Sequence, residues 1–206
     1  MARDTQSIVK MSRREGYALH PKAHKALVKR SSLPGQRPGY MSRNKPSQYA
    51  LQLREKQKVK RLYGLLERQF SKLMAEAVKS RGQSGQILLR FLELRLDNVV
   101  YRAGFATSRR ASRQLVTHGH FMFNGKRVDV PSIRVKQGDV LVVRDHSKGT
   151  EYFKRLDEVS PASPNDIPAW LKVDRKKLQI TVSDLPTRED SEPDINEQLI
   201  VEYYSR

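Results

Sequence analysis

Apolar side chains recur at helical spacing between residues 47 and 79. The stripe runs from Val59 to Ala77, and Ser47 offers a cap for the start of a helix. One continuous stripe predicts one helix that buries a single face. Residues 1–46 carry few large apolar side chains and are rich in basic residues, Gly, Pro and Ser. Such a segment cannot bury enough surface to offset its ordering entropy, so we expect a basic extended arm there.

A second apolar stripe covers residues 88–103 after a break at residues 82–85, and Gly104 marks its end. Ser108 then predicts the cap of a shorter helix that stops near Gly119. Three arginines of this shorter helix lie off its apolar face: Arg109, Arg110 and Arg113. We expect them to point outward, so that replacing all three with alanine weakens ligand binding without unfolding the chain.

The pattern changes to short strands between residues 120 and 144. Asn124-Gly125 separates two short runs, and both residues accept positive backbone φ, which predicts a hairpin. Alternating aromatic residues on a hairpin are more often core than exposed, so Phe121 and Phe123 are expected inside. Residues 135–144 predict a further strand. Two helices plus a short antiparallel sheet therefore form a small α/β module.

The carboxyl-terminal quarter is apolar enough to pack on another element. Residues 178–182 alternate as in a strand, and Asp194 with Glu197 forms a capping-box pattern for a last helix. We expect an α+β fold in four parts: an arm over 1–46, a helical domain beginning at 47–93, the module inserted at 94–157, and a segment 158–206 that packs back on the helical domain.

Charge indicates the class of ligand. The formal net charge is +18, from 40 basic and 22 acidic side chains. Residues 156–206 hold 11 acidic and 6 basic side chains, so the excess lies in residues 1–155. Charge of this size repels itself unless a negative partner neutralises it. Nucleic acid is the first candidate, since no apolar run reaches the ~18 residues of a membrane span and no signal-peptide pattern opens the chain. The acidic end is either structural or a docking face for a basic protein.

Arginine forks suit phosphate oxygens, and the first turn of a helix adds amide donors. The grooves of A-form RNA favour recognition of shape and backbone. The expected RNA contacts of the arm and first helix are Arg3, Lys10, Arg13, Arg14, Lys22, Lys29, Arg30, Arg37, Arg43, Lys45, Tyr49, Arg54, Lys56, Gln57, Lys58 and Arg61. Those of the module are Arg95, Arg109, Arg110, Arg113, Gln114, His118, His120, Lys126 and Arg127. The alternatives are a solvated lysine-rich helix face and surface arginines that serve solubility.

Nothing in the sequence favours catalysis. There is no glycine-rich phosphate loop, nucleophile elbow or carboxylate pair in an apolar setting. The chain has no cysteine, which excludes disulfides and thiolate zinc sites. Two pairs of histidines occur, at 20 and 24 and at 118 and 120. Neither pair is accompanied by a carboxylate or thiolate that could complete a metal site. We therefore expect no enzyme, metal, cofactor or small-molecule substrate.

Four segments carry a family resemblance across nearly the whole chain. They are YALQLREKQK at 49–58 with the residues to 70, RLDNVVYRAGF at 95–105 with 108–131, PTRED at 186–190, and IVEYYSR at 200–206. Together they resemble bacterial small-subunit ribosomal protein four. The module alone also occurs in pseudouridine synthases, some synthetases and heat-shock RNA binders, whereas the helical and carboxyl-terminal signatures make the resemblance specific.

The resemblance implies a cytoplasmic ribosomal protein that binds 16S rRNA first and nucleates assembly of the subunit body. It also implies contact with ribosomal protein five and an influence on decoding accuracy. Many relatives carry zinc-binding cysteines in a CxLCRREG-like pattern, where this chain has Val9 and Ser12. The resemblance thus implies a zinc-free form whose arm orders on RNA. Two alternatives remain: a free regulatory or stress-response RNA binder, and an RNA-binding fragment of an RNA-modifying enzyme, for which the assigned segments leave no catalytic domain.

Overall fold

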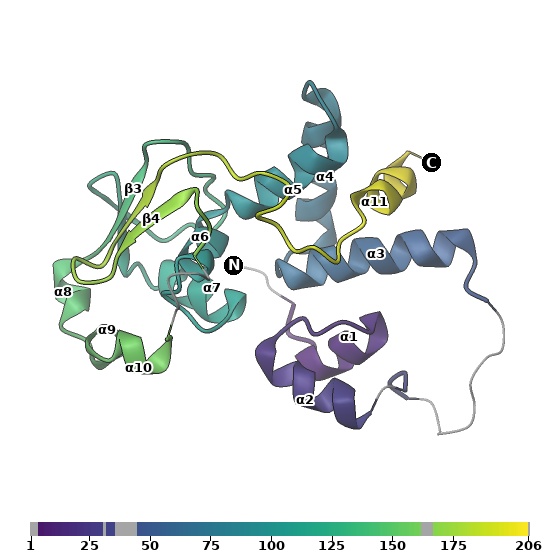
Figure 1. The fold of residues 1–206 in the computed structure, drawn as a ribbon, viewed down its shortest axis with the longest axis horizontal. Coiled ribbons are helices and arrows are strands. Elements are labelled where there is room, and N and C mark those ends of the chain that lie inside the picture. Colours follow the sequence, from purple (N-terminus) through teal and green to yellow (C-terminus); the bar gives the residue numbers. More distant parts are fainter. Residues whose placement is uncertain (1–3, 31, 36–44, 162–166, 206) are drawn as a thin grey trace. The chain divides into compact units, whose positions relative to one another are not determined.

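The computed structural model describes residues 4–30, 32–35, 45–161 and 167–205. The chain forms two compact units (Figure 1). Unit 1 comprises residues 1–88 and 193–206, and unit 2 comprises residues 89–192. Unit 2 is thus bounded on both sides in the sequence by segments of unit 1.

Unit 1 is helical. Its helices are α1 (Ile8–Glu15), α2 (Pro21–Lys29), α3 (Gln48–Leu62), α4 (Glu67–Lys79), the first part of α5 (Ser84–Glu93) and α11 (Glu197–Tyr204). The single helix expected over 47–79 is therefore wrong, because the chain turns between α3 and α4. Gly64 has a φ of +66°, and the Leu65 amide returns to the Lys60 carbonyl at 2.9 Å, as in the end of a helix closed by a left-handed residue. The apolar stripe continues across the turn, which is why the periodicity conceals it.

The expectation of an extended arm is wrong over residues 8–29, which fold as the helix pair α1 and α2. The pair buries Met11, Leu19 and Ala23. Buried Ser12 links α1 to the loop before α2, since the hydroxyl donates to the Ile8 carbonyl at 2.8 Å and accepts from the Leu19 amide at 3.3 Å. These contacts, together with ion pairs from Glu15 of α1 to Arg54 and Arg61 of α3, hold this basic segment in place.

Helix α11 packs on α3 within unit 1. Gln52 of α3 donates to Glu202 of α11 at 2.7 Å, and the rings of Tyr49 and Tyr203 lie 5.9 Å apart. The N-cap of α11 is Asn196, whose side chain accepts from the Gln198 amide, so the capping box expected at residue 194 is wrong by two positions. The expectation that the last helix packs on the helical segment before residue 90 agrees with this contact.

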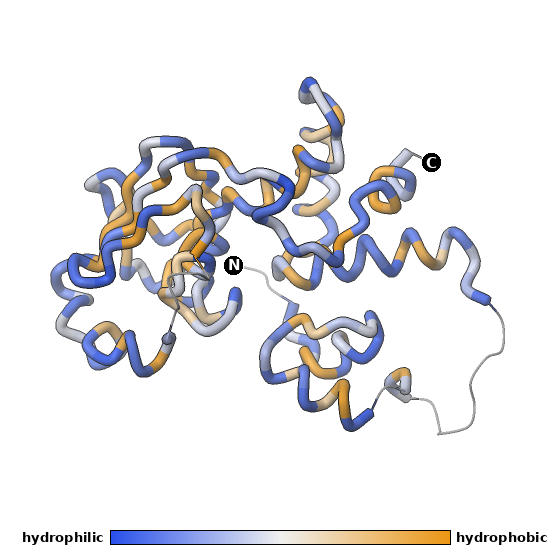
Figure 2. Tube along the Cα trace, viewed as in Figure 1, coloured by the Kyte–Doolittle hydropathy of each residue, from blue (hydrophilic) through white to orange (hydrophobic). Residues whose placement is uncertain are grey.

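Unit 2 combines helices with one antiparallel sheet, which confirms the α+β class. The strands are β1 (Phe121–Phe123), β2 (Lys126–Val128), β3 (Val140–Val143), β4 (Leu171–Asp174) and β5 (Gln179–Val182), in the order β2-β1-β3-β5-β4. The helices are the rest of α5, α6 (Leu96–Arg102), α7 (Arg109–Thr117), and the short α8 (Asp145–Lys148), α9 (Glu151–Lys154) and α10 (Leu156–Val159). Hydrophobic residues recur along the strands and on α6 (Figure 2).

The sheet is larger than the module expected over 94–157. Strand β5 pairs with β3, opposing Ile180 to Leu141, and both side chains are about 1% exposed. Residues 171–182 therefore belong to unit 2, and the expectation that all of 158–206 packs on the helical domain is wrong for them. The reason is the core, where Trp170 and Val182 join the apolar cluster that also contains Phe121.

The expected helix over 88–103 is interrupted at residues 94 and 95. There the chain exchanges backbone hydrogen bonds with residues 131–135: the Leu96 amide donates to Ile133 at 2.8 Å, and the Val135 amide donates to Leu94 at 2.9 Å. Arg95 forms an isolated antiparallel bridge with Arg134. This nonlocal pairing separates α5 from α6 although the apolar spacing runs through it.

The hairpin is confirmed. Asn124 and Gly125 have φ values of +48° and +79°, and Phe121 opposes Val128 across the two strands. Phe121 is fully buried, and Phe123 is half-buried against the same core, as expected for this pair of aromatic residues.

Candidate nucleic-acid interface

The helix pair of unit 1 presents exposed cations. Lys22, Lys25 and Lys29 of α2 lie at positions i, i+3 and i+7 and so share one face. The helix contains no acidic residue, and the His20 side chain caps it by accepting from the Lys22 amide at 3.1 Å. The other exposed expected contacts here are Lys10, Arg14, Arg30 and Lys45. These side chains are free to meet phosphate without first leaving a buried site.

Arg13 has a different position. Its guanidinium donates to the Ser32 carbonyl at 2.8 and 3.1 Å, and the side chain is half-buried. It therefore ties α1 to the segment after α2. The expected contacts Arg3, Arg37 and Arg43 lie outside the described residues.

The basic patch expected on α3 is largely neutralised within unit 1. Arg54 and Arg61 both bind the buried carboxylate of Glu15. Burial raises the pKa of Glu15, while the two guanidiniums act to lower it. Lys58 pairs with Glu55 at 2.9 Å.

Lys56 is 3% exposed, which contradicts its expected role as a surface phosphate contact. Its ammonium lies 2.8 Å from Glu67 and 4.5 Å from the ring centroid of Tyr203. Burial works to raise the pKa of Glu67, but hydrogen bonds from Lys56, Lys60 and Tyr204 outweigh it and lower the pKa to about 2. Of the remaining α3 residues, Gln57 is half-buried and Tyr49 is 48% exposed.

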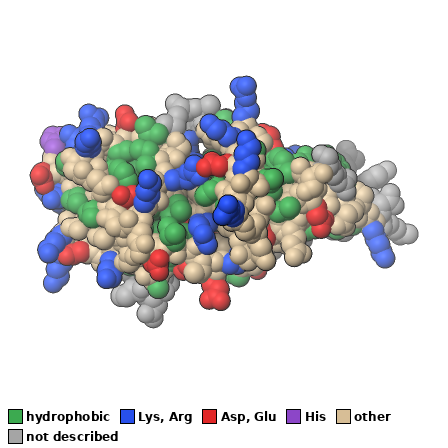
Figure 3. Space-filling view, turned by 90° about the horizontal axis from the view of Figure 1, so that it is seen from above, with side chains coloured by type: hydrophobic (Ala, Val, Ile, Leu, Met, Phe, Trp, Pro, Cys, Tyr) green, Lys and Arg blue, Asp and Glu red, His purple; other side chains and the backbone are tan. Residues whose placement is uncertain are grey.

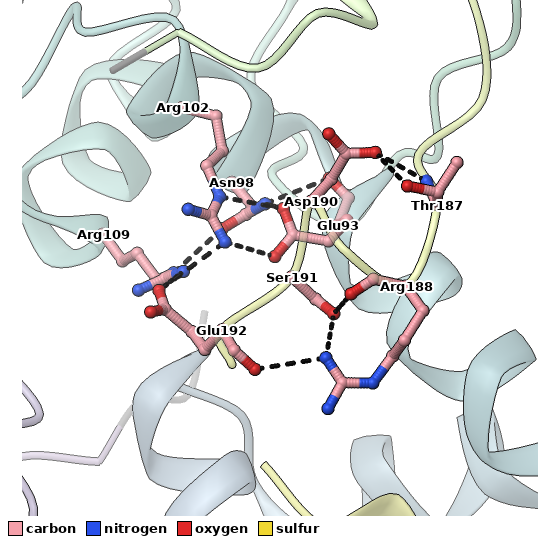
Figure 4. Close-up of polar contacts among 9 residues, drawn as sticks. All are labelled: Glu93, Asn98, Arg102, Arg109, Thr187, Arg188, Asp190, Ser191 and Glu192. Atoms are coloured by element: carbon pink, nitrogen blue, oxygen red, sulfur yellow. Dashed lines mark hydrogen bonds and ion pairs between the residues drawn. The ribbon is translucent and has the colours of Figure 1, made fainter. Parts of the chain in front are cut away.

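Arg109, at the start of α7, points toward other side chains of unit 2, as Figure 4 shows. Arg109 donates to Asn98 at 2.9 Å and to Glu192 at 2.9 Å. Arg102 binds Glu93 in a two-pronged contact at 2.8 and 3.0 Å, and it also lies 3.5 Å from Glu192. The Glu93 side chain is fully buried. This cluster links α5, α6, α7 and the segment at 188–192, so the main role of its arginines is to stabilise the fold.

A second cluster surrounds Asp97. Arg95 is 4% exposed and binds the Asp97 carboxylate at 2.8 and 3.1 Å. Arg113 binds the same carboxylate at 3.1 Å. The expectation that Arg109 and Arg113 lie free on the surface is therefore wrong: the apolar periodicity located them off the core, but carboxylates from other elements cover them.

Five of the expected contacts in unit 2 are exposed. They are Arg110, Gln114, His118, Lys126 and Arg127. The first three follow one another at intervals of four on and just after α7, and the last two lie on β2, an edge strand of the sheet. We call these five residues the α7–β2 face. His120, the remaining expected contact, is half-buried, with Nδ1 3.0 Å from the Ser147 hydroxyl.

Basic side chains are scattered over the face seen in Figure 3 and do not gather in one patch. Arg144 was missed from the sequence. Its guanidinium donates to the Gly119 carbonyl at 3.1 Å, next to the α7–β2 face. The available signal was its place at the end of the strand predicted over 135–144, which does not distinguish it from other surface arginines.

Ser12 occupies one of the positions at which many relatives carry a zinc-binding cysteine. Ser12 is fully buried and its hydroxyl is satisfied by two backbone partners, so it does not present a metal ligand. In the part of the chain that the structure describes, no three His, Cys, Asp or Glu side chains are grouped to hold a metal ion. The residues present do not fit a zinc site.

None of the described helices is long and apolar enough to cross a membrane.

Comparison with known proteins covers the whole chain. Residues 3–93 match the ribosomal protein S4/S9 N-terminal domain, and residues 94–141 match the S4 domain. The chain is 47% identical to small ribosomal subunit protein uS4A of Symbiobacterium thermophilum, 48% to uS4 of Chloroflexus aurantiacus and 49% to uS4A of Clostridium botulinum, with 100% of each chain covered. The chain therefore belongs to the uS4 family of small-subunit ribosomal proteins.

Proposed function

We propose that this protein is a structural constituent of the small ribosomal subunit that binds 16S rRNA through its exposed cations and acts in the cytoplasm as part of the ribosome, with no enzymatic role. The observation that carries the proposal is full-length similarity to proteins named small ribosomal subunit protein uS4. The excess of positive charge and the S4 domain support it. A polyanion that neutralises this charge gains affinity mainly by releasing its counterions.

The contacts are proposed to come from the exposed set, namely the lysine face of α2 and the α7–β2 face. The ion-paired arginines at 95, 109 and 113 act by fixing α6 and α7, on which that face is built. The fold thus separates arginines that hold the scaffold from cations that meet phosphate.

A further part of the proposal concerns assembly. By resemblance, the protein binds rRNA early, nucleates the subunit body, contacts ribosomal protein five and contributes with it to decoding accuracy. Exposed carboxylates in the acidic end, such as Asp184, Glu189 and Glu202, offer docking points for a basic protein. Crosslinking on assembled subunits tests this contact, because an absence of crosslinks to protein five contradicts it.

Cofractionation distinguishes a ribosomal constituent from a free RNA binder. We expect the protein to migrate with small subunits through a sucrose gradient at high salt. Migration only at the top of the gradient, with RNA binding retained, contradicts the ribosomal role and supports a free regulatory RNA binder.

A further inference from the structure

Cationic and titratable side chains converge on Gly119, directly after α7. The Arg127 guanidinium packs against it: a Cβ placed on Gly119 would lie 2.8 Å from Nε and 3.0 Å from Nη2 of Arg127. Arg144 donates to the Gly119 carbonyl at 3.1 Å. His118 and His120 flank the glycine in sequence, with ring centroids 6.0 Å apart. We call these five residues the Gly119 corner.

Glycine is what permits this approach. Gly119 has a φ of +70°, the left-handed conformation that ends many helices and that glycine adopts without strain. The same residue therefore stops α7 and leaves room for the Arg127 fork.

The charge of the corner is not neutralised within the protein. Arg95, Arg109 and Arg113 all bind carboxylates, whereas neither Arg127 nor Arg144 forms an ion pair with any described residue. An uncompensated pair of arginines beside two histidines attracts an anion. Arginine offers a planar fork that matches two phosphate oxygens.

The neighbouring helices α8 and α9 do not neutralise the positive charge of the corner. In α8, the carboxylate of Asp145 pairs with Lys148 at 2.7 Å, and His146 is exposed. In α9, Glu151 pairs with Arg155 at 3.2 Å, and Phe153 meets the His120 ring edge-on at 5.8 Å. The acids of these two helices are thus already paired with other cations.

His120 gives the corner a titratable group. Burial lowers the pKa of His120, and the nearby His118 and Arg144 lower it further. These surroundings favour the neutral imidazole, whereas a bound phosphate would favour its charged form. Anion binding at this point is expected to take up a proton.

We propose that the Gly119 corner binds one phosphate group of the RNA backbone, with the Arg127 fork as its main ligand and Arg144 and the two histidines around it. This site rests on the proposed rRNA-binding function and names the chemistry of one contact within it. The exposed row Arg110, Gln114 and His118 runs along α7 and ends at the residue before Gly119.

The test compares Arg127→Gln with Lys172→Gln. Both positions are exposed cations in the same sheet, but Lys172 lies on β4, the edge opposite to β2. Binding of the full chain to a small-subunit rRNA fragment is measured between ~50 and ~300 mM salt. We expect Arg127→Gln to reduce the slope of log K against log salt by ~0.7–0.9, the value for one lost phosphate contact. Lys172→Gln should leave the slope unchanged.

A second readout uses pH. Because binding takes up a proton at His120, wild-type affinity should rise as the pH falls from ~8 to ~6, and His120→Gln should flatten this dependence. Wild-type binding with equal slopes for Arg127→Gln and Lys172→Gln overturns the site alone. Failure of the wild type to bind the rRNA overturns the proposed function together with the site. Thermal unfolding of each variant verifies that the fold is intact.

Discussion

Arg109 and Arg110 are adjacent in sequence but should behave oppositely when replaced with alanine. Arg109 is held by Asn98 and Glu192 and stacks over the Tyr101 ring at 4.6 Å, whereas Arg110 is exposed. We therefore expect Arg109→Ala to destabilise unit 2 and Arg110→Ala to leave its stability unchanged while weakening RNA binding.

The magnitude for Arg109→Ala follows from its contacts. Asn98 is 2% exposed, so its side-chain oxygen loses a buried partner, which costs ~1–3 kcal/mol. The ion pair with Glu192 is partly exposed, with side chains 13% and 22% accessible, and contributes up to ~1 kcal/mol. The stacking on Tyr101 adds ~0.5–1 kcal/mol. Since neighbouring contributions are not additive, we expect a total of about 2–3 kcal/mol.

Thermal unfolding followed by circular dichroism measures the effect. Near ~4 °C per kcal/mol for a domain of about this size, the midpoint of unit 2 should fall by roughly 8–12 °C in Arg109→Ala. Arg110→Ala should stay within ~0.5 kcal/mol of the wild type. Equal stability losses in the two variants, or none in Arg109→Ala, would refute the assignment of Arg109 to the scaffold.

Three further changes test other parts of the account. The folded pKa of Glu67 is lowered to about 2 from 4.5, so its carboxylate stabilises the fold above pH 4.5 and this contribution is lost as the pH falls toward 2. Glu67→Gln should therefore lose less stability than the wild type over that range in urea titrations. An equal loss in the variant and the wild type contradicts the Glu67 contacts. Ser108 caps α7 by accepting from the Ala111 amide at 3.3 Å, so Ser108→Ala should lower the free energy of unfolding by about 1 kcal/mol. An unchanged free energy of unfolding contradicts a stabilising role for this cap. Replacing Lys22, Lys25 and Lys29 with glutamine should reduce the salt slope of rRNA binding by up to ~2–3 at unchanged melting temperature, whereas an unchanged slope places the RNA elsewhere.

Local signals in the sequence predicted local structure well. The Asn124-Gly125 hairpin, the Ser108 cap and the stop at Gly119 each depend on one or two residues with a specific backbone preference. The family signatures at 49–70 and 200–206 predicted identity for the same reason, since they can be recognised residue by residue.

Features set by distant residues were not predictable in this way. The breaks after α3 and α5 lie inside uninterrupted apolar stripes, and the second depends on pairing with residues 131–135. The carboxylates that pair with the arginines are also distant in sequence: Glu192 is 83 residues from Arg109. Periodicity shows that a side chain lies off the core but not whether a carboxylate covers it.

The same limit explains the size of unit 2. Residues 179–182 have the alternation of a strand, but the sequence does not show that β5 pairs with β3. Once that pair is known, the short helices α8 to α10 become the connection from β3 to β4, two strands of one sheet that β5 separates.

The salt dependence of binding to a small-subunit rRNA fragment tests the central claim most directly. The protein is expected to bind through several phosphate contacts made by exposed cations, so log K should fall linearly with log salt, with a slope of ~0.7–0.9 per contact. The slope should decrease in Arg127→Gln and in the triple lysine variant of α2, but not in Lys172→Gln. Binding that barely changes between ~50 and ~200 mM salt would contradict the account.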